Sequence, residues 1–179
     1  MHATALEPLL DRLTCGRYAP AALILAASVA TLGGAFLFQY VGGLAPCILC
    51  IYERCPYGVA IALALLAFCL GDGRARGAAL AFCALAFAVD AGISAFHVGV
   101  EQHWWEGTAA CTGSVVSGAA GSLEALRQHI LNAPPAARCD RIPWQLFGIS
   151  LAGYNLLITL GLAVFSLHAA RRAIRRGQR

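Results

Sequence analysis

Long apolar stretches alternate with short polar connections along most of this chain. A stretch of about 20 apolar residues is long enough to cross a bilayer as an α-helix. Such stretches occupy residues 20–41, 51–70, 78–99 and 145–167. The pattern predicts an all-α integral membrane protein, a bundle of four transmembrane helices with both termini on one side of the membrane.

Composition and charge support this prediction and orient the helices. Of the 179 residues, 59% are apolar and only 12% are charged, too few charges for a soluble domain of this length. All thirteen basic residues are arginines, and nine of them flank the predicted spans on one side: Arg12, Arg17, Arg74, Arg76, Arg171, Arg172, Arg175, Arg176 and Arg179. The positive-inside rule places this side in the cytoplasm. The 42–50 turn and the 100–144 loop then face the periplasm, if the membrane is a bacterial inner membrane.

The topology divides the chain into a cytoplasmic tail (1–19), a membrane domain (20–167) and an Arg-rich cytoplasmic tail (168–179). The net charge of +4 does not call for a nucleic acid partner, because topology and contact with anionic membrane lipid account for it. The first apolar stretch is too long for a cleaved signal peptide, so it is expected to remain as an anchor.

Eight cysteines separate into groups on this topology. Cys47 and Cys50 form a C-x-x-C pair at the outer end of the second span, while Cys111 and Cys139 lie in the long outer loop. An oxidising compartment permits disulfides between these four, in any of three pairings. Structural roles, as small buried side chains, are expected for the other four: Cys15, Cys55, Cys69 and Cys83.

Two cofactor sites fit the cysteine pattern poorly. A c-type haem site needs a histidine after the second cysteine of the pair, and Ile51 stands there. Zinc bound by four cysteines favours two close pairs, but 27 residues separate Cys111 from Cys139, so no metal site is predicted. Purely structural disulfides remain an alternative for these four cysteines.

The place of the C-x-x-C pair at a helix start favours reactive thiols. Unpaired N–H groups and the helix dipole stabilise a thiolate there, and Arg54 follows Cys50 by one helical turn. An arginine close to hydrocarbon usually anchors the helix at the interface or serves a site. Beside Glu53, it is suited to donate hydrogen bonds to a quinone head whose apolar tail lies in the bilayer.

The outer loop and the third span carry further signals. Residues 113–131 place apolar side chains at three- and four-residue steps, which predicts a short amphipathic helix on the membrane surface. Prolines around Cys139 predict an extended segment, either mobile or a stiff connector.

In the third span, Asp90, His97 and Glu101 are seven and four residues apart, approximately on one helical face. They are candidates for a proton path, or for hydrogen bonds that only pack the bundle.

Together, these motifs resemble the disulfide bond formation protein B (DsbB) family. The resemblance rests on "PCILCIYERC" at 46–55, one loop cysteine on each side of the amphipathic stretch, and "CDRIPWQLFGISLAGYNLL" at 139–157. It implies an inner-membrane oxidase that takes electrons from a DsbA-like thioredoxin-fold dithiol protein and passes them to ubiquinone or menaquinone.

Carried over by motif position, the resemblance implies that Cys111 forms a mixed disulfide with the partner. Cys139 would pass electrons to Cys47, and Cys50 would face the quinone beside Arg54. Glu53 matches an acid of the family at that position. Two alternatives remain open: an outward-directed thiol reductase, and a disulfide-stapled scaffold without enzymatic activity. Pro56 is also expected to kink the second helix close to Arg54.

Overall fold

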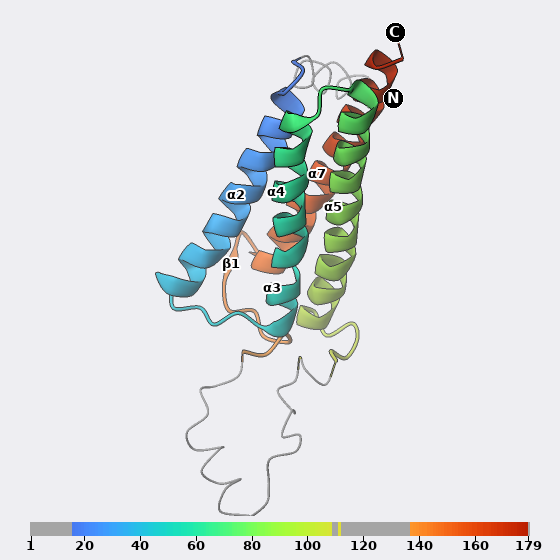
Figure 1. Cartoon of the computed structure of the whole chain (residues 1–179). Helices are drawn as coiled ribbons and strands as arrows, with labels where there is room; N and C mark the ends of the chain where they lie inside the picture. Colours follow the sequence, from blue (N-terminus) through green and yellow to red (C-terminus); the bar gives the residue numbers. More distant parts are fainter. Residues whose placement is uncertain (1–15, 109–110, 112–136, 179) are drawn as a thin grey trace, which may run out of the picture.

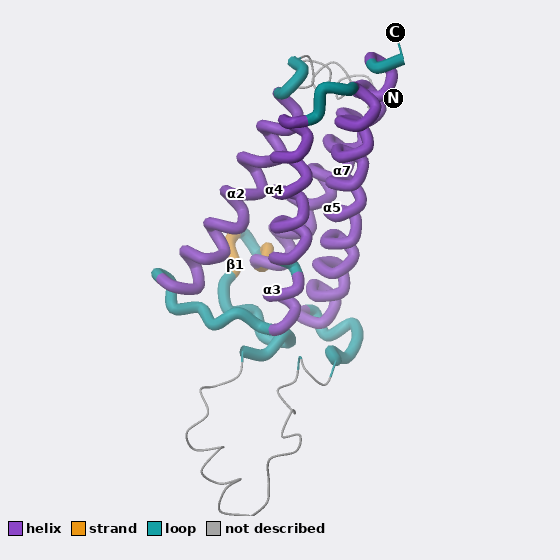
Figure 2. Tube along the Cα trace, viewed as in Figure 1, coloured by secondary structure: helices purple, strands orange, loops and turns teal. Residues whose placement is uncertain are grey.

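A computed structural model of the chain describes residues 16–108, 111 and 137–178, and these form a helical bundle (Figures 1 and 2). In this part of the chain, four helical segments are long and apolar enough to cross a membrane: Ala19–Tyr40, Ile48–Cys69, Gly73–Glu101 and Leu151–Arg176. The predicted fold class is therefore confirmed. The amphipathic helix expected over 113–131 lies outside the described residues.

The second span is interrupted. It consists of a short helix α3 (Ile48–Tyr52) and a longer helix α4 (Arg54–Cys69), with Glu53 at the junction. Pro56 explains the break, because its ring has no N–H for the carbonyl of Tyr52 and clashes with that carbonyl in a regular helix. The helix is thus interrupted near Pro56, as expected, and the Glu53 residue at the junction is buried, with only 8% of it exposed.

The third span is longer than its apolar pattern indicates. Helix α5 (Gly73–Glu101) begins five residues before the predicted start, because the Asp72 side chain accepts a hydrogen bond from the N–H of Ala75 and caps the helix. Arg76 lies within this helix and is buried. Its guanidinium donates to the carbonyls of Ala67 and Leu70, which satisfies the end of α4.

The fourth span begins later than predicted. Residues 145–150 form a small hairpin in which β1 (Gln145–Leu146) pairs antiparallel with β2 (Ile149–Ser150). Both turn residues, Phe147 and Gly148, have positive φ, as in a type I′ turn. Helix α7 (Leu151–Arg176) follows, and its last turn carries arginines into the region expected to be a tail.

The helices pack through small side chains. Buried alanines of α4, α5 and α7 form much of the core, together with larger residues such as Ile24 of α2 (Ala19–Tyr40) and Phe87. Between α5 and α7 there is no room for a side chain at Gly77, where an added Cβ would collide with Ile174. This close approach agrees with the expectation that small residues mediate helix contact in the membrane.

The four site cysteines lie at one end of the bundle, which we call the cysteine end. The start of α2 and the end of α7 lie at the other end, as Figure 1 shows. At the cysteine end, Trp105 folds back over α5, stacks on Phe96 and donates its indole N–H to the Phe96 carbonyl. Trp104 remains largely exposed there, as is typical of a tryptophan at a membrane interface.

Candidate functional site

The C-x-x-C pair forms the start of α3. Cys47 is the N-cap residue, and its Sγ accepts a hydrogen bond from the backbone N–H of Cys50. The two sulfur atoms are 2.9 Å apart. Cys47 is buried and Cys50 is half-buried. The pair is therefore held within contact distance at a helix start, as its spacing predicted.

The pKa of Cys47 differs from the expectation of a stabilised thiolate. Its pKa is raised above the ordinary value, first by the hydrogen bond to the Cys50 side chain and then by burial. In that hydrogen bond the Cys47 thiol keeps its proton. The backbone N–H of Cys50 acts in the opposite direction, but α3 has only five residues and its helix dipole is correspondingly small.

The loop cysteines join the same cluster. Cys111 and Cys139 are both fully buried, and the N–H of Cys139 donates to the Cys111 carbonyl over 3.1 Å. Burial raises the pKa of Cys139 to about 11, and hydrogen bonding to the Cys111 side chain raises it further, whereas hydrogen bonding to Cys47 acts to lower it. Cys139 therefore packs in one buried cluster with Cys47 and Cys111, and Cys50 packs against this cluster.

The other described cysteines lie outside this cluster, as expected. Cys55 and Cys69 are exposed at the helix surface, so the expectation that they are buried is wrong for these two. Cys83 is fully buried in the bundle core, where its thiol contacts the Ala60 carbonyl. Cys15 lies outside the described residues.

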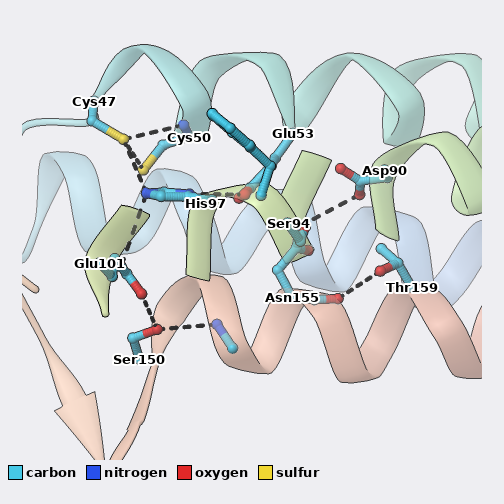
Figure 3. Close-up of polar contacts among 12 residues, drawn as sticks. Cys47, Cys50, Glu53, Asp90, Ser94, His97, Glu101, Ser150, Asn155 and Thr159 are labelled. Carbon is cyan, nitrogen blue, oxygen red and sulfur yellow. Dashed lines mark hydrogen bonds and ion pairs between the residues drawn. The ribbon is translucent and has the colours of Figure 1, made fainter. Parts of the chain in front are cut away.

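A histidine from the third span contacts the C-x-x-C pair (Figure 3). Nε2 of His97 lies 3.5 Å from Sγ of Cys47, and Nδ1 lies 2.9 Å from Oε1 of Glu53. Both His97 and Glu53 are buried. A carboxylate accepts a hydrogen from Nδ1, which leaves Nε2 directed at the cysteine sulfur. Glu53, at the junction of α3 and α4, therefore positions the imidazole that faces Cys47.

Glu101 extends this buried polar group toward α7. Its Oε1 lies 3.9 Å from Nε2 of His97, and its Oε2 accepts a hydrogen bond of 2.5 Å from the Ser150 hydroxyl. The Ser150 oxygen also accepts from the N–H of Gly153 and caps α7. Sequence reasoning missed Ser150, although a serine directly before an apolar run is a typical N-cap signal.

Asp90 belongs to a separate polar group deeper in the bundle. Its Oδ2 accepts from the Asn155 amide over 3.5 Å, and the same amide donates to the Ser94 hydroxyl over 2.8 Å. Tyr57 donates to the Asn155 carbonyl oxygen over 2.6 Å. Asp90 thus contacts neither His97 nor Glu101 directly. Tyr57 and Asn155 were also missed, and their signal was a polar side chain inside an apolar span.

Arg54 points away from the thiols. Its Nη1 donates to the Gln39 side chain of α2 over 2.6 Å, and its guanidinium lies 5.0 Å from the centre of the Phe36 ring. In the described part of the chain, its buried Nε has no hydrogen-bond partner. The side chain in contact with Cys47 is that of His97, a residue for which the sequence suggested only a role in proton transfer.

Comparison with known proteins assigns this arrangement to a family. A family model described as "Disulfide bond formation protein DsbB" matches residues 17–169. The chain belongs to the DsbB family. Two relatives named disulfide bond formation protein B, from Xanthomonas oryzae pv. oryzae (strain MAFF 311018) and Aromatoleum aromaticum, are 31% and 30% identical to the chain. The matches cover 74% and 80% of this chain, and 78% and 86% of the relatives.

A further relative, an uncharacterized protein of Rickettsia prowazekii, is 27% identical over 80% of this chain and 81% of its own length. No solved structure shows significant similarity to the chain. Membership of the DsbB family and the four apolar helices identify a multi-pass membrane protein that acts in disulfide bond formation as a disulfide oxidoreductase.

Proposed function

We propose that this DsbB-family chain is a thiol oxidase of the bacterial inner membrane that reoxidises a DsbA-like periplasmic thioredoxin-fold protein and reduces a membrane quinone. The observation that carries the proposal is the position of Cys139, buried between Cys111 and Cys47. Thiol–disulfide exchange needs a thiolate in direct reach of a disulfide sulfur. In the proposed order Cys111, Cys139, Cys47, Cys50, each exchange would occur between cysteines of the same buried cluster.

The proposed exchange balances in two stages. The partner's dithiol attacks a Cys111–Cys139 disulfide at Cys111; the partner leaves as a disulfide, and both loop cysteines become thiols. Cys139 then attacks a Cys47–Cys50 disulfide at Cys47, and closure by Cys111 restores the loop disulfide. The two electrons and two protons taken from the partner now reside on the C-x-x-C dithiol.

Arg54, one helical turn after Cys50, and its neighbours on α2 could hold a quinone. The unpartnered Nε of Arg54 is a buried donor suited to a carbonyl oxygen, and exposed Phe36 and Ile51 offer apolar surface to a tail. A bound ubiquinone or menaquinone accepts two electrons and two protons. In this proposal Arg54 binds the quinone head and Glu53 orients His97 beside the dithiol.

Buried acids and a histidine are suited to handle the protons. We propose that His97 receives the proton of the Cys47 thiol at Nε2, with Glu101 as the neighbouring acceptor. Asp90 lies in the separate polar group with Asn155 and Ser94, so the proposed path does not include it. The position of several arginines at the end opposite the cysteines supports cytoplasmic termini and a periplasmic cysteine end (Figure 1).

A single-turnover experiment tests the proposal. Purified protein in detergent is mixed with a reduced DsbA-type protein and ubiquinone or menaquinone, while quinone absorbance is followed. Wild type and the matched control Cys69→Ser should reduce one quinone per turnover. Cys111→Ser should block electron entry from the partner, and Cys50→Ser should block quinone reduction.

Absence of turnover by wild type with both quinones would contradict the oxidase. A scaffold would give two disulfides that never exchange with the partner. An outward-directed reductase would instead lose activity in Cys69→Ser or Cys83→Ser and keep it in Cys111→Ser.

A further inference from the structure

The C-x-x-C pair and His97 bring three potential metal ligands together. Sγ of Cys47, Sγ of Cys50 and Nε2 of His97 all lie within 4.8 Å of one another. Figure 3 shows the three atoms converging from α5 and from the start of α3. Cys47 and His97 are buried, and Cys50 is half-buried. Two thiolates and an imidazole are ligands typical of protein-bound Zn²⁺.

We propose that the reduced protein binds one Zn²⁺ ion through Cys47, Cys50 and His97, with a fourth position left open. The sequence argued against zinc because the loop cysteines are not a second close pair. The structure supplies a third ligand from a different helix. A set of two cysteines and one histidine with an open position is an established zinc coordination pattern in enzymes.

The distances suit a tetrahedral ion after a small movement. Zinc bonds of about 2.3 Å to sulfur and 2.05 Å to nitrogen separate a sulfur from a nitrogen by about 3.5 Å, and two sulfurs by about 3.8 Å. The Sγ of Cys47 already lies 3.5 Å from Nε2 of His97. The two sulfurs, 2.9 Å apart, need to separate by about 0.9 Å, which rotation of the half-buried Cys50 side chain can supply.

Glu53 supports the proposed site by binding the ring nitrogen of His97 that does not face the sulfurs. Metal-bound histidines usually donate their second ring N–H to a carboxylate, which fixes the tautomer and the ring orientation. Nδ1 of His97 has this partner in Oε1 of Glu53, 2.9 Å away. Two thiolates also neutralise the charge of the ion, so the bound unit suits a buried position.

Binding is restricted to the dithiol form. Zn²⁺ displaces the thiol protons of Cys47 and Cys50 to solvent, and no electron moves. A Cys47–Cys50 disulfide offers no thiolates and does not bind the ion. If the proposed oxidase function holds, Zn²⁺ traps the reduced dithiol and inhibits quinone reduction.

Cobalt titration of the full-length protein in detergent tests the site directly. Reduced wild type should take up one Co²⁺ per chain, with a thiolate charge-transfer band and the visible bands of tetrahedral Co²⁺, and Zn²⁺ should displace it. The disulfide form should show neither signal. His97→Ala should lose the tetrahedral signal, while His103→Ala and Cys69→Ser should keep it. Glu53→Gln should weaken binding by about 10- to 100-fold.

Alkylation provides a second measurement for each variant whose helical content, measured by circular dichroism, matches that of the wild type. Zn²⁺ should protect Cys50 from modification in the reduced wild type but leave the exposed Cys69 reactive. If His97→Ala misfolds, the site is tested instead by the Co²⁺ affinity of Glu53→Gln and by the protection of Cys50 from alkylation in the presence of Zn²⁺. The proposal is overturned if reduced wild type binds no Co²⁺, if the disulfide form binds equally, or if a folded His97→Ala keeps the signal. Neither assay uses the partner or a quinone, so failure here leaves the oxidase proposal standing, and failure of turnover leaves metal binding measurable.

Discussion

Cys139 is fully buried, and it packs with Cys47 and Cys111 in one cluster. Burial is the largest cause that raises its pKa, to about 11 from an ordinary value of 9.0. A raised thiol pKa means that the protonated form predominates at neutral pH, so the attacking thiolate is scarce until the pH rises.

The thiolate fraction of Cys139 is therefore expected to increase about tenfold per pH unit up to its pKa. In reduced protein, alkylation of Cys139 followed by mass spectrometry should give a midpoint near pH 11. In Cys111→Ala the midpoint should fall, because the hydrogen bond to the Cys111 side chain, which raises the pKa, is lost. A wild-type midpoint at or below 9.0 would contradict the raised pKa of Cys139.

The helices were predictable from the sequence where residues within the same segment determine them. The four spans follow from apolar length, the helix start at Cys47 from its position, and the break before Arg54 from Pro56. The pairing of Glu53 with His97 was not predictable, because it depends on how α5 packs against the second span. Seven residues also carry Asp90 about 10 Å along the helix from His97, so a shared face did not bring the two into contact.

The interruption of the second span at Pro56 is expected to matter for activity through Glu53. In Pro56→Ala, α3 and α4 should join into one regular helix, and we expect this change to move Glu53 away from His97. Single-turnover quinone reduction should then slow on the order of 10- to 100-fold, since displacements of about 1 Å at a site have such effects. The exposed Pro143 provides a control, and Pro143→Ala should leave the rate unchanged. An unaltered rate in a folded Pro56→Ala would show that the interruption at Pro56 is not needed for quinone reduction.

On the scale of the whole molecule, the reactive thiols and the arginines of α7 lie at opposite ends of the bundle. The thiols, His97 and Glu101 gather at the cysteine end, whereas the arginines of α7 lie at the opposite end (Figure 1). Arg76 at that end is buried against the carbonyls that terminate α4. In the proposed topology, this polarity would place the thiols in an oxidising compartment and the arginines beside anionic lipid.

The same polarity predicts which end a reagent outside the cell can reach. Gln102 and Gln178 are exposed glutamines at opposite ends of the bundle, so Gln102→Cys and Gln178→Cys form a matched pair. A membrane-impermeant maleimide should label position 102 in cells whose outer membrane alone is opened, and position 178 only after the inner membrane is permeabilised. Mass spectrometry of each peptide distinguishes the new cysteine from the native ones. Labelling of position 178 first would reverse the topology, and it would place the cysteine cluster in a reducing compartment where a DsbA-like partner could not reach it.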